Sequence, residues 1–110
     1  MLVHNKCVYA YLDEALKRQG LDEVPTGGFK QTWVENGYKI EVRAHAGNPQ
    51  YTSSQQIFRV SRQKIVPSGM QGMGVEYLGS NSVWYHTSYL KPTSALYNSF
   101  VARITHIPVP

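Results

Sequence analysis

The chain has 110 residues, which is enough for one small folded domain and too few for several. Its formal charge of +4 would attract phosphate groups or an acidic protein surface. A single cysteine, Cys7, excludes an intramolecular disulfide and a multi-cysteine zinc site. No apolar run is long enough to span a bilayer and no signal-peptide pattern is present, so we expect a soluble domain that, if exported, travels inside a larger protein.

Residues 1–7 are expected to be a junction, and residues 8–110 a single domain. The stretch from Val8 to Gln19 is the only segment whose apolar residues recur at helical spacing, and Gly20 supplies a stop. The sequence therefore predicts one N-terminal helix. Its predicted apolar stripe consists of Val8, Tyr11, Leu12, Ala15 and Leu16.

After a loop with Pro25, Gly27 and Gly28, the pattern changes to short strands. Residues 29–35 precede Asn36-Gly37, a dipeptide that favours a tight type I′ hairpin turn. One helix followed by antiparallel strands predicts an α+β fold, in which the N-terminal helix packs on one strongly twisted antiparallel sheet of four to six strands. The later predicted strands are residues 38–46, 56–62, 75–78, 83–90 and 98–107.

The alternation of residues 38–47 is the clearest strand pattern in the chain. Strand side chains repeat with period 2, which places Ile40 and Val42 on one face and Arg43 and His45 on the other. Residues 56–62 alternate in the same way, with Arg59 and Ser61 on the polar face. If these two strands are neighbours, their polar residues form one patch.

Such a patch suits RNA cleavage without a metal ion. When the 2′-hydroxyl attacks phosphorus, a base takes its proton, an acid protonates the leaving 5′-oxygen, and cations stabilise the charged phosphorane. Histidine suits both proton transfers and arginine suits the phosphate. We therefore assign proton transfer to His45 and His86, and phosphate binding to Arg43 and Arg59, with Thr87 assisting. Candidate substrate-binding residues are Ser61, Lys91, Tyr51, Thr105 and His106.

Each candidate also has a structural interpretation. His45 could be a solvated residue at a strand end, and Arg43 and Arg59 could be the water-exposed face of an antiparallel sheet. His86 shares its face with Trp84, which favours a buried, hydrogen-bonded histidine about as strongly as a catalytic acid.

The C-terminal candidates divide by strand face. If residues 98–107 form a strand, His106 lies with Ala102 and Ile104 and is structural, whereas Thr105 lies on the polar side. Tyr51 could stack on a base, but an aromatic-rich small sheet also needs tyrosines in its core.

Other enzyme classes fit less well. The chain has no Gly-x-Ser-x-Gly elbow, no phosphate-binding loop and no dinucleotide fingerprint. A metal nuclease would require clustered Asp and Glu residues at its site. Four of the seven acidic residues instead lie in or just after the predicted helix, away from the strands that carry the candidate histidines and arginines. We expect neither a metal nor a cofactor.

Four short motifs of the chain are similar to those of a known group of proteins: residues 40–49, 58–62, 84–87 and 104–108. Together they resemble the C-terminal toxin domains of bacterial polymorphic toxins, most closely the type 30 group, which are predicted ribonucleases with a barnase/EndoU/colicin/RelE-like fold. The N-terminal Leu2-Val3-His4-Asn5 also resembles the junction that often precedes such domains.

The resemblance implies a toxin that is part of a larger secreted carrier, enters a competitor's cytoplasm and cleaves tRNA or other RNA. It also implies a cognate immunity protein, for which we expect an acidic surface. Two other functions stay open: a non-enzymatic RNA- or protein-binding module, and a toxin that acts on NAD. The residues that match the family's motifs are Arg43, His45, Arg59, His86, Thr87, Thr105 and His106.

Overall fold

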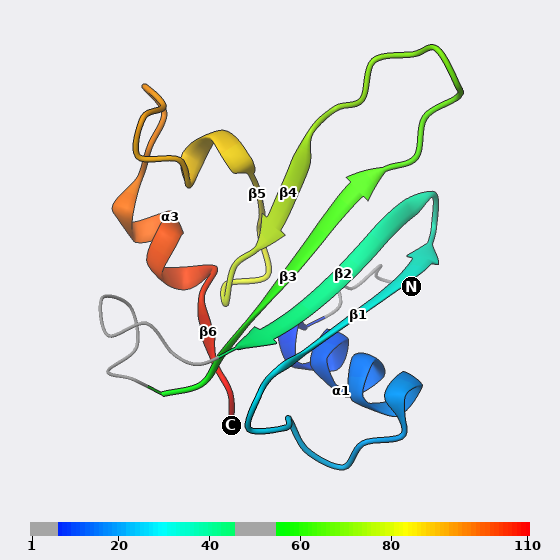
Figure 1. Cartoon of the computed structure of the whole chain (residues 1–110). Helices are drawn as coiled ribbons and strands as arrows, with labels where there is room; N and C mark the ends of the chain where they lie inside the picture. Colours follow the sequence, from blue (N-terminus) through cyan, green and yellow to red (C-terminus); the bar gives the residue numbers. More distant parts are fainter. Residues whose placement is uncertain (1–6, 46–54) are drawn as a thin grey trace, which may run out of the picture.

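The computed structural model describes residues 7–45 and 55–110 and shows an α+β architecture in which a helix packs on a twisted, open antiparallel sheet (Figure 1). The predicted fold class is confirmed. Tyr51, predicted to bind substrate, lies outside the described residues.

Helix α1 spans Val8–Gln19, as predicted, and ends at Gly20, whose left-handed backbone lets its N–H reach the carbonyls of Leu16 and Lys17. The apolar stripe of α1 is buried against the sheet, which is why this amphipathic segment is stable as a helix.

No helix in the described part of the chain is long and apolar enough to cross a membrane.

Within residues 7–45 and 55–110 the sheet has six strands, in the order β1-β2-β3-β4-β5, and β6 pairs with β3. The turn between β1 and β2 has positive φ at both Asn36 and Gly37, so the predicted hairpin is confirmed. The strands are β1 (Phe29–Glu35), β2 (Tyr38–His45), β3 (Ile57–Lys64), β4 (Val75–Leu78), β5 (Trp84–His86) and β6 (Ile107–Pro108).

The two faces of this sheet differ in character. The face toward α1, here called the helix face, carries the core residues Val42 and Val60, which are directly opposite each other. The other face carries Lys30, Arg43 and Arg59, and is here called the cationic face. The core on the helix face also includes Trp33, Ile40, Ala44, Phe58, Leu78 and Ile107.

The predicted last strand, residues 98–107, is wrong. Residues Ser99–Ile104 form helix α3, whose first turn is capped by the side chain of Asn98, and only Ile107–Pro108 pairs with β3. The Asn98 cap and the spacing of the buried residues Val101 and Ala102 favour a helix over the alternation that we assumed.

The strand predicted for residues 83–90 is also shorter than expected. Only Trp84–His86 is extended, and Thr87–Tyr89 forms the 3-10 helix η1. The ring of His86 causes this change of direction, because its Nδ1 accepts a hydrogen bond from the backbone N–H of Ser88.

Gly28 is required where the chain enters β1. Its φ is +78°, and a Cβ there would collide with the carbonyl oxygen of Ala44. We expect Gly28→Ala to lower the free energy of unfolding by about 1–3 kcal/mol through backbone strain. The collision with Ala44 adds to this loss. Gly27→Ala is the matched control, since a Cβ at Gly27 meets nothing within 4 Å. Urea denaturation measures both variants, and equal stability of the two would contradict the close approach.

Candidate functional site

Three cations lie in one row across the cationic face. Lys30 is directly opposite Arg43, and Arg43 is directly opposite Arg59. Like charges that face each other across antiparallel strands destabilise a sheet, so this row costs folding energy that a bound anion would offset. A row of this kind matches a polyanion, whose phosphates repeat along a chain.

The surroundings of the two arginines hold them in different ways. Arg43 Nε lies 3.7 Å from the Glu41 carboxylate, and its side chain is 54% exposed, which leaves it accessible to a ligand. The guanidinium of Arg59 lies 4.0 Å from the centre of the Tyr77 ring, and its Nε is buried. Arg59 is therefore the more buried cation of the pair and Arg43 the more exposed one.

A cavity of about 200 Å³ lies between these groups. Its lining combines cations, one carboxylate and two hydroxyls, all from the polar faces of β2, β3 and β4. Ser61, a predicted substrate-binding residue, is opposite both Glu41 and Tyr77. The residues that line the cavity are Glu41, Arg43, Arg59, Ser61 and Tyr77.

His106 joins this site from the C-terminal segment. It lies between α3 and β6, and the register in which Ile107 is opposite Phe58 leads to His106 beside Arg59, on the cationic face. Burial lowers the pKa of His106 below 6.5; its hydrogen bond to the Ala102 carbonyl opposes the shift, and the charges of Arg59 and His45 add to it.

The tautomer of His106 follows from the same hydrogen bond. A carbonyl oxygen only accepts, so Nδ1 donates to Ala102 and carries the proton. The neutral ring therefore keeps its lone pair on Nε2. A neutral imidazole with this lone pair is suited to take a proton from a hydroxyl.

His45 and His86, to which we assigned proton transfer, lie on opposite faces of the sheet and do not share one cleft. His86 is opposite Glu76, Glu76 is opposite Arg62, and Arg62 is opposite the core residue Ile40. Partners in register share a face, so His86 lies on the helix face, whereas His45 lies on the cationic face. Alternation shows which residues of one strand share a face. It does not show which face the next strand's residues take, because the loop between two strands can have any length.

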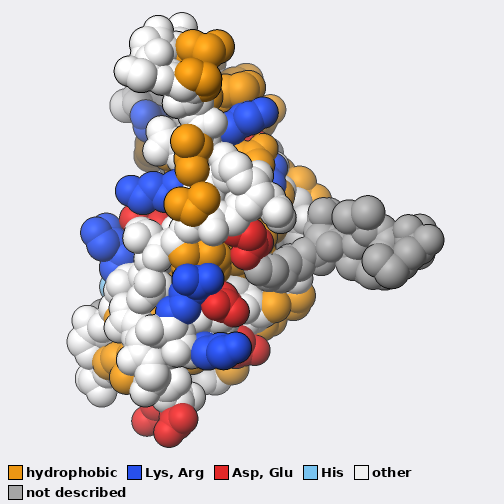
Figure 2. Space-filling model, turned by 90° about the vertical axis from the view of Figure 1, so that its right-hand side faces the viewer, with side chains coloured by type: hydrophobic (Ala, Val, Ile, Leu, Met, Phe, Trp, Pro, Cys, Tyr) orange, Lys and Arg blue, Asp and Glu red, His pale blue; other side chains and the backbone are white. Residues whose placement is uncertain are grey.

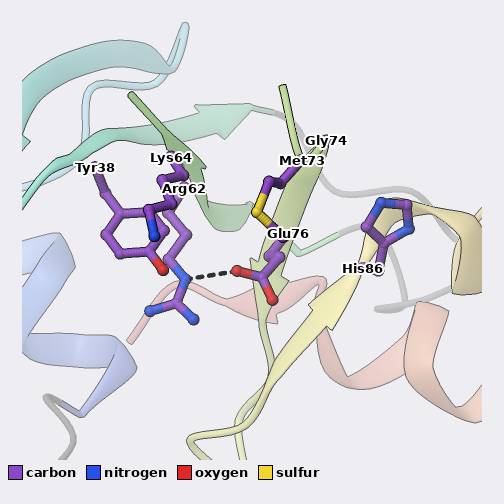
Figure 3. Close-up of a pocket in the computed structure, with 7 residues that line it drawn as sticks. All are labelled: Tyr38, Arg62, Lys64, Met73, Gly74, Glu76 and His86. Atoms are coloured by element: carbon purple, nitrogen blue, oxygen red, sulfur yellow. Dashed lines mark hydrogen bonds and ion pairs between the residues drawn. The ribbon is translucent and has the colours of Figure 1, made fainter. Parts of the chain in front are cut away.

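His86 instead lines a cavity on the helix face (Figure 3). Neither Thr87, the first residue of η1, nor the exposed Lys91 lines the cavity between Arg43 and Arg59.

Thr105 is not a surface residue. It is fully buried, and its hydroxyl donates to the carbonyls of Val101 and Ala102, so it caps the end of α3. The prediction that Thr105 lies on the polar side and His106 on the structural side is thus reversed. Both errors follow from treating a helix as a strand.

Three residues of the site were not predicted from the sequence. Glu41 and Tyr77 line the cavity, and Lys30 completes the cation row. Lys30 could have been found, because a two-residue hairpin at Asn36-Gly37 fixes its register opposite Arg43. The strand pairing that brings Tyr77 beside Ser61 leaves no such signal.

Comparisons with protein-family models, with curated proteins and with solved structures found no match. Among the described residues, no group of three or more His, Cys, Asp or Glu side chains could hold a metal ion.

The lowered pKa of His106 predicts a pH dependence of stability. Below pH 6.5 the unfolded chain binds a proton at this imidazole more readily than the folded chain, so the contribution of His106 to stability is lost as the pH falls from 6.5 toward the folded pKa. We expect urea midpoints to fall less steeply in His106→Asn than in the wild type between about pH 7 and pH 5. Identical slopes in the two proteins would contradict the burial of this imidazole.

Proposed function

We propose that this chain is a metal-independent endoribonuclease that cleaves RNA by attack of the 2′-hydroxyl on the adjacent phosphorus. The observation that carries the proposal is the direct pairing of Arg43 with Arg59, next to two imidazoles on the same side of the sheet. A phosphodiester between the arginines would relieve their repulsion. It would also bring its reacting atoms toward His45 and His106.

The site suggests a role for each group. Arg43 and Arg59 bind the phosphate and stabilise the charge that develops on its oxygens. His106 accepts the proton of the 2′-hydroxyl at Nε2, and His45 donates a proton to the leaving 5′-oxygen. Glu41 keeps Arg43 over the cavity through their ion pair. The products are a 2′,3′-cyclic phosphate and a 5′-hydroxyl.

The biological setting is part of the same proposal. The motifs that resemble polymorphic toxin domains and the net charge of +4 support a toxin domain carried by a larger secreted protein. Such a domain acts on RNA, for example tRNA, in a competitor's cytoplasm. A cognate immunity protein with an acidic surface would protect the producing cell.

The cleavage chemistry is tested with total RNA in excess chelator. We expect cleavage with 2′,3′-cyclic phosphate ends, lowered about 10²–10⁴-fold in His45→Asn and in His106→Asn, because each removes one proton-transfer group. Arg43→Gln should lose a comparable factor while its stability changes by no more than about 0.5 kcal/mol, since its ion pair is exposed.

Lys17→Gln is the control for this experiment, because Lys17 is an exposed cation on α1. Full activity in the His45→Asn, His106→Asn double variant would end the mechanism. RNA that binds but stays intact would instead support the binding module. Release of nicotinamide from NAD would support the third function.

The cation row makes a separate prediction about RNA binding. Each Lys or Arg that neutralises a phosphate of a single strand contributes about 0.7 unit to the slope of log Kd against log salt. We expect Lys30→Gln to reduce that slope by about 0.7 unit and to leave the rate at saturating RNA unchanged. Fluorescence anisotropy with a labelled single-stranded RNA measures the slope, and an unchanged slope would remove Lys30 from the interface.

A further inference from the structure

The helix face carries a second polar cavity, at the outer ends of β3, β4 and β5. Its volume is about 260 Å³, below the range of about 300–1,000 Å³ that drug-sized ligands occupy, so it fits a smaller group. None of its lining residues belongs to the cavity between Arg43 and Arg59. The lining residues are Tyr38, Arg62, Lys64, Met73, Gly74, Glu76 and His86.

Arg62 and Glu76 form the rigid centre of this cavity. Arg62 Nε donates to Glu76 Oε1 at 2.8 Å, as Figure 3 shows. The same guanidinium lies between two rings, 4.5 Å from the centre of Tyr38 and 4.2 Å from that of Trp84. This sandwich fixes the plane of the guanidinium. It also fixes the carboxylate, whose second oxygen remains an acceptor for a ligand.

His86 is oriented just as firmly. Its Nδ1 accepts from the backbone N–H of Ser88 at 3.1 Å, so the proton of the neutral ring is on Nε2. That nitrogen faces Gly74, where an added Cβ would lie 2.6 Å from it. His86 therefore presents a hydrogen-bond donor at the edge of the cavity.

These groups lie in a fixed order across the strands. Arg62 is opposite Glu76, and Glu76 is opposite His86, so a donor, an acceptor and a donor follow one another. Lys64 adds a further donor on the Arg62 side (Figure 3). Because Glu76 neutralises Arg62, the centre of the row has no net charge that would attract a simple anion.

A ligand that pairs with these three groups has a planar edge with an acceptor, a donor and an acceptor in this order. The imide edge of uracil has this order, with a carbonyl on each side of N3–H. Cytosine has an acceptor in place of that N–H, which would face the Glu76 carboxylate without a proton between them. The apolar side chain of Met73, which is exposed and lines the cavity, suits the face of a base. Figure 2 shows further apolar side chains at the top of the molecule.

We propose that this cavity binds an unpaired uracil base through Glu76, His86 and the Arg62–Lys64 side. Unpaired bases are commonly recognised in this way, by hydrogen bonds to their Watson–Crick edges and by contacts to their faces. The proposal requires a uracil-containing ligand and no cleavage. It therefore stands or falls separately from the ribonuclease function.

The test is titration of the whole chain with free nucleosides, followed by backbone amide shifts in NMR spectra. Uridine should shift the amides of Gly74, Glu76 and His86, and should bind at least about tenfold more tightly than cytidine or 3-methyluridine, because both lack the N3–H that Glu76 accepts. Equal binding of 3-methyluridine would overturn the proposal. Ribose 5-phosphate that binds as tightly as uridine would also overturn it, by showing an anion site only.

Two glycines of the β3–β4 connection provide matched variants. Gly74→Ala pushes a methyl group against His86 Nε2 and should abolish uridine binding, whereas Gly72→Ala meets nothing within 4 Å and should bind as the wild type does. Thermal melts check that both variants are folded. His86→Gln tests the same donor without backbone strain, and unchanged uridine affinity in that variant would contradict the assignment.

Discussion

The antiparallel pairing of β2 with β3 is the constraint on which the rest of the structure depends. Eight residue pairs fix the register, and Val42 opposite Val60 lies at the centre of the core. Because side chains alternate, this core pair forces the next pair, Arg43 and Arg59, onto the opposite face. A slip of β3 by one residue would turn Arg59 into the core and Val60 out of it, so the apolar core and the cation row are specified by the same register.

The cation row is a local cost that this register imposes. Placing Lys30 and Arg59 on either side of Arg43 is unfavourable in the free protein. The repulsion is only partly offset. The Glu41 carboxylate lies 3.7 Å from Arg43, and the face of the Tyr77 ring lies against Arg59. A sheet selected for stability alone would place opposite charges in such a row. The arrangement is therefore better explained by a ligand that carries the missing negative charge.

Local patterns predicted those parts of the fold that local interactions determine. The helix from Val8 to Gln19 and the turn at Asn36-Gly37 were both correct, because the apolar stripe, the stop at Gly20 and the positive φ angles are encoded in neighbouring residues. The helix needs only the period of one element, and the hairpin only the geometry of one turn. The shared face of Arg43 and Arg59 was predicted on the condition that their strands are neighbours, and β2 does pair with β3.

The remainder of the site depends on how distant segments meet. His106 reaches Arg59 and His45 because residues Ser99–Ile104 form a helix, where strand alternation had assigned His106 to the apolar side. His86 is not part of the predicted site, because the strand register places it on the same face as Arg62, through Glu76, and not on the face of Arg59. Neither relation is visible in the periodicity of a single segment.

Arg59 and Arg62 show how one strand can supply two chemically different surfaces. They are an odd number of residues apart on β3, so alternation sends them to opposite faces. Arg59, beside another arginine and two histidines, retains an attraction for phosphate. Arg62, paired with Glu76 and enclosed by aromatic rings, is neutralised and becomes a fixed donor. The same residue type therefore favours a charged ligand on one face and a neutral, planar one on the other, and its neighbours decide which.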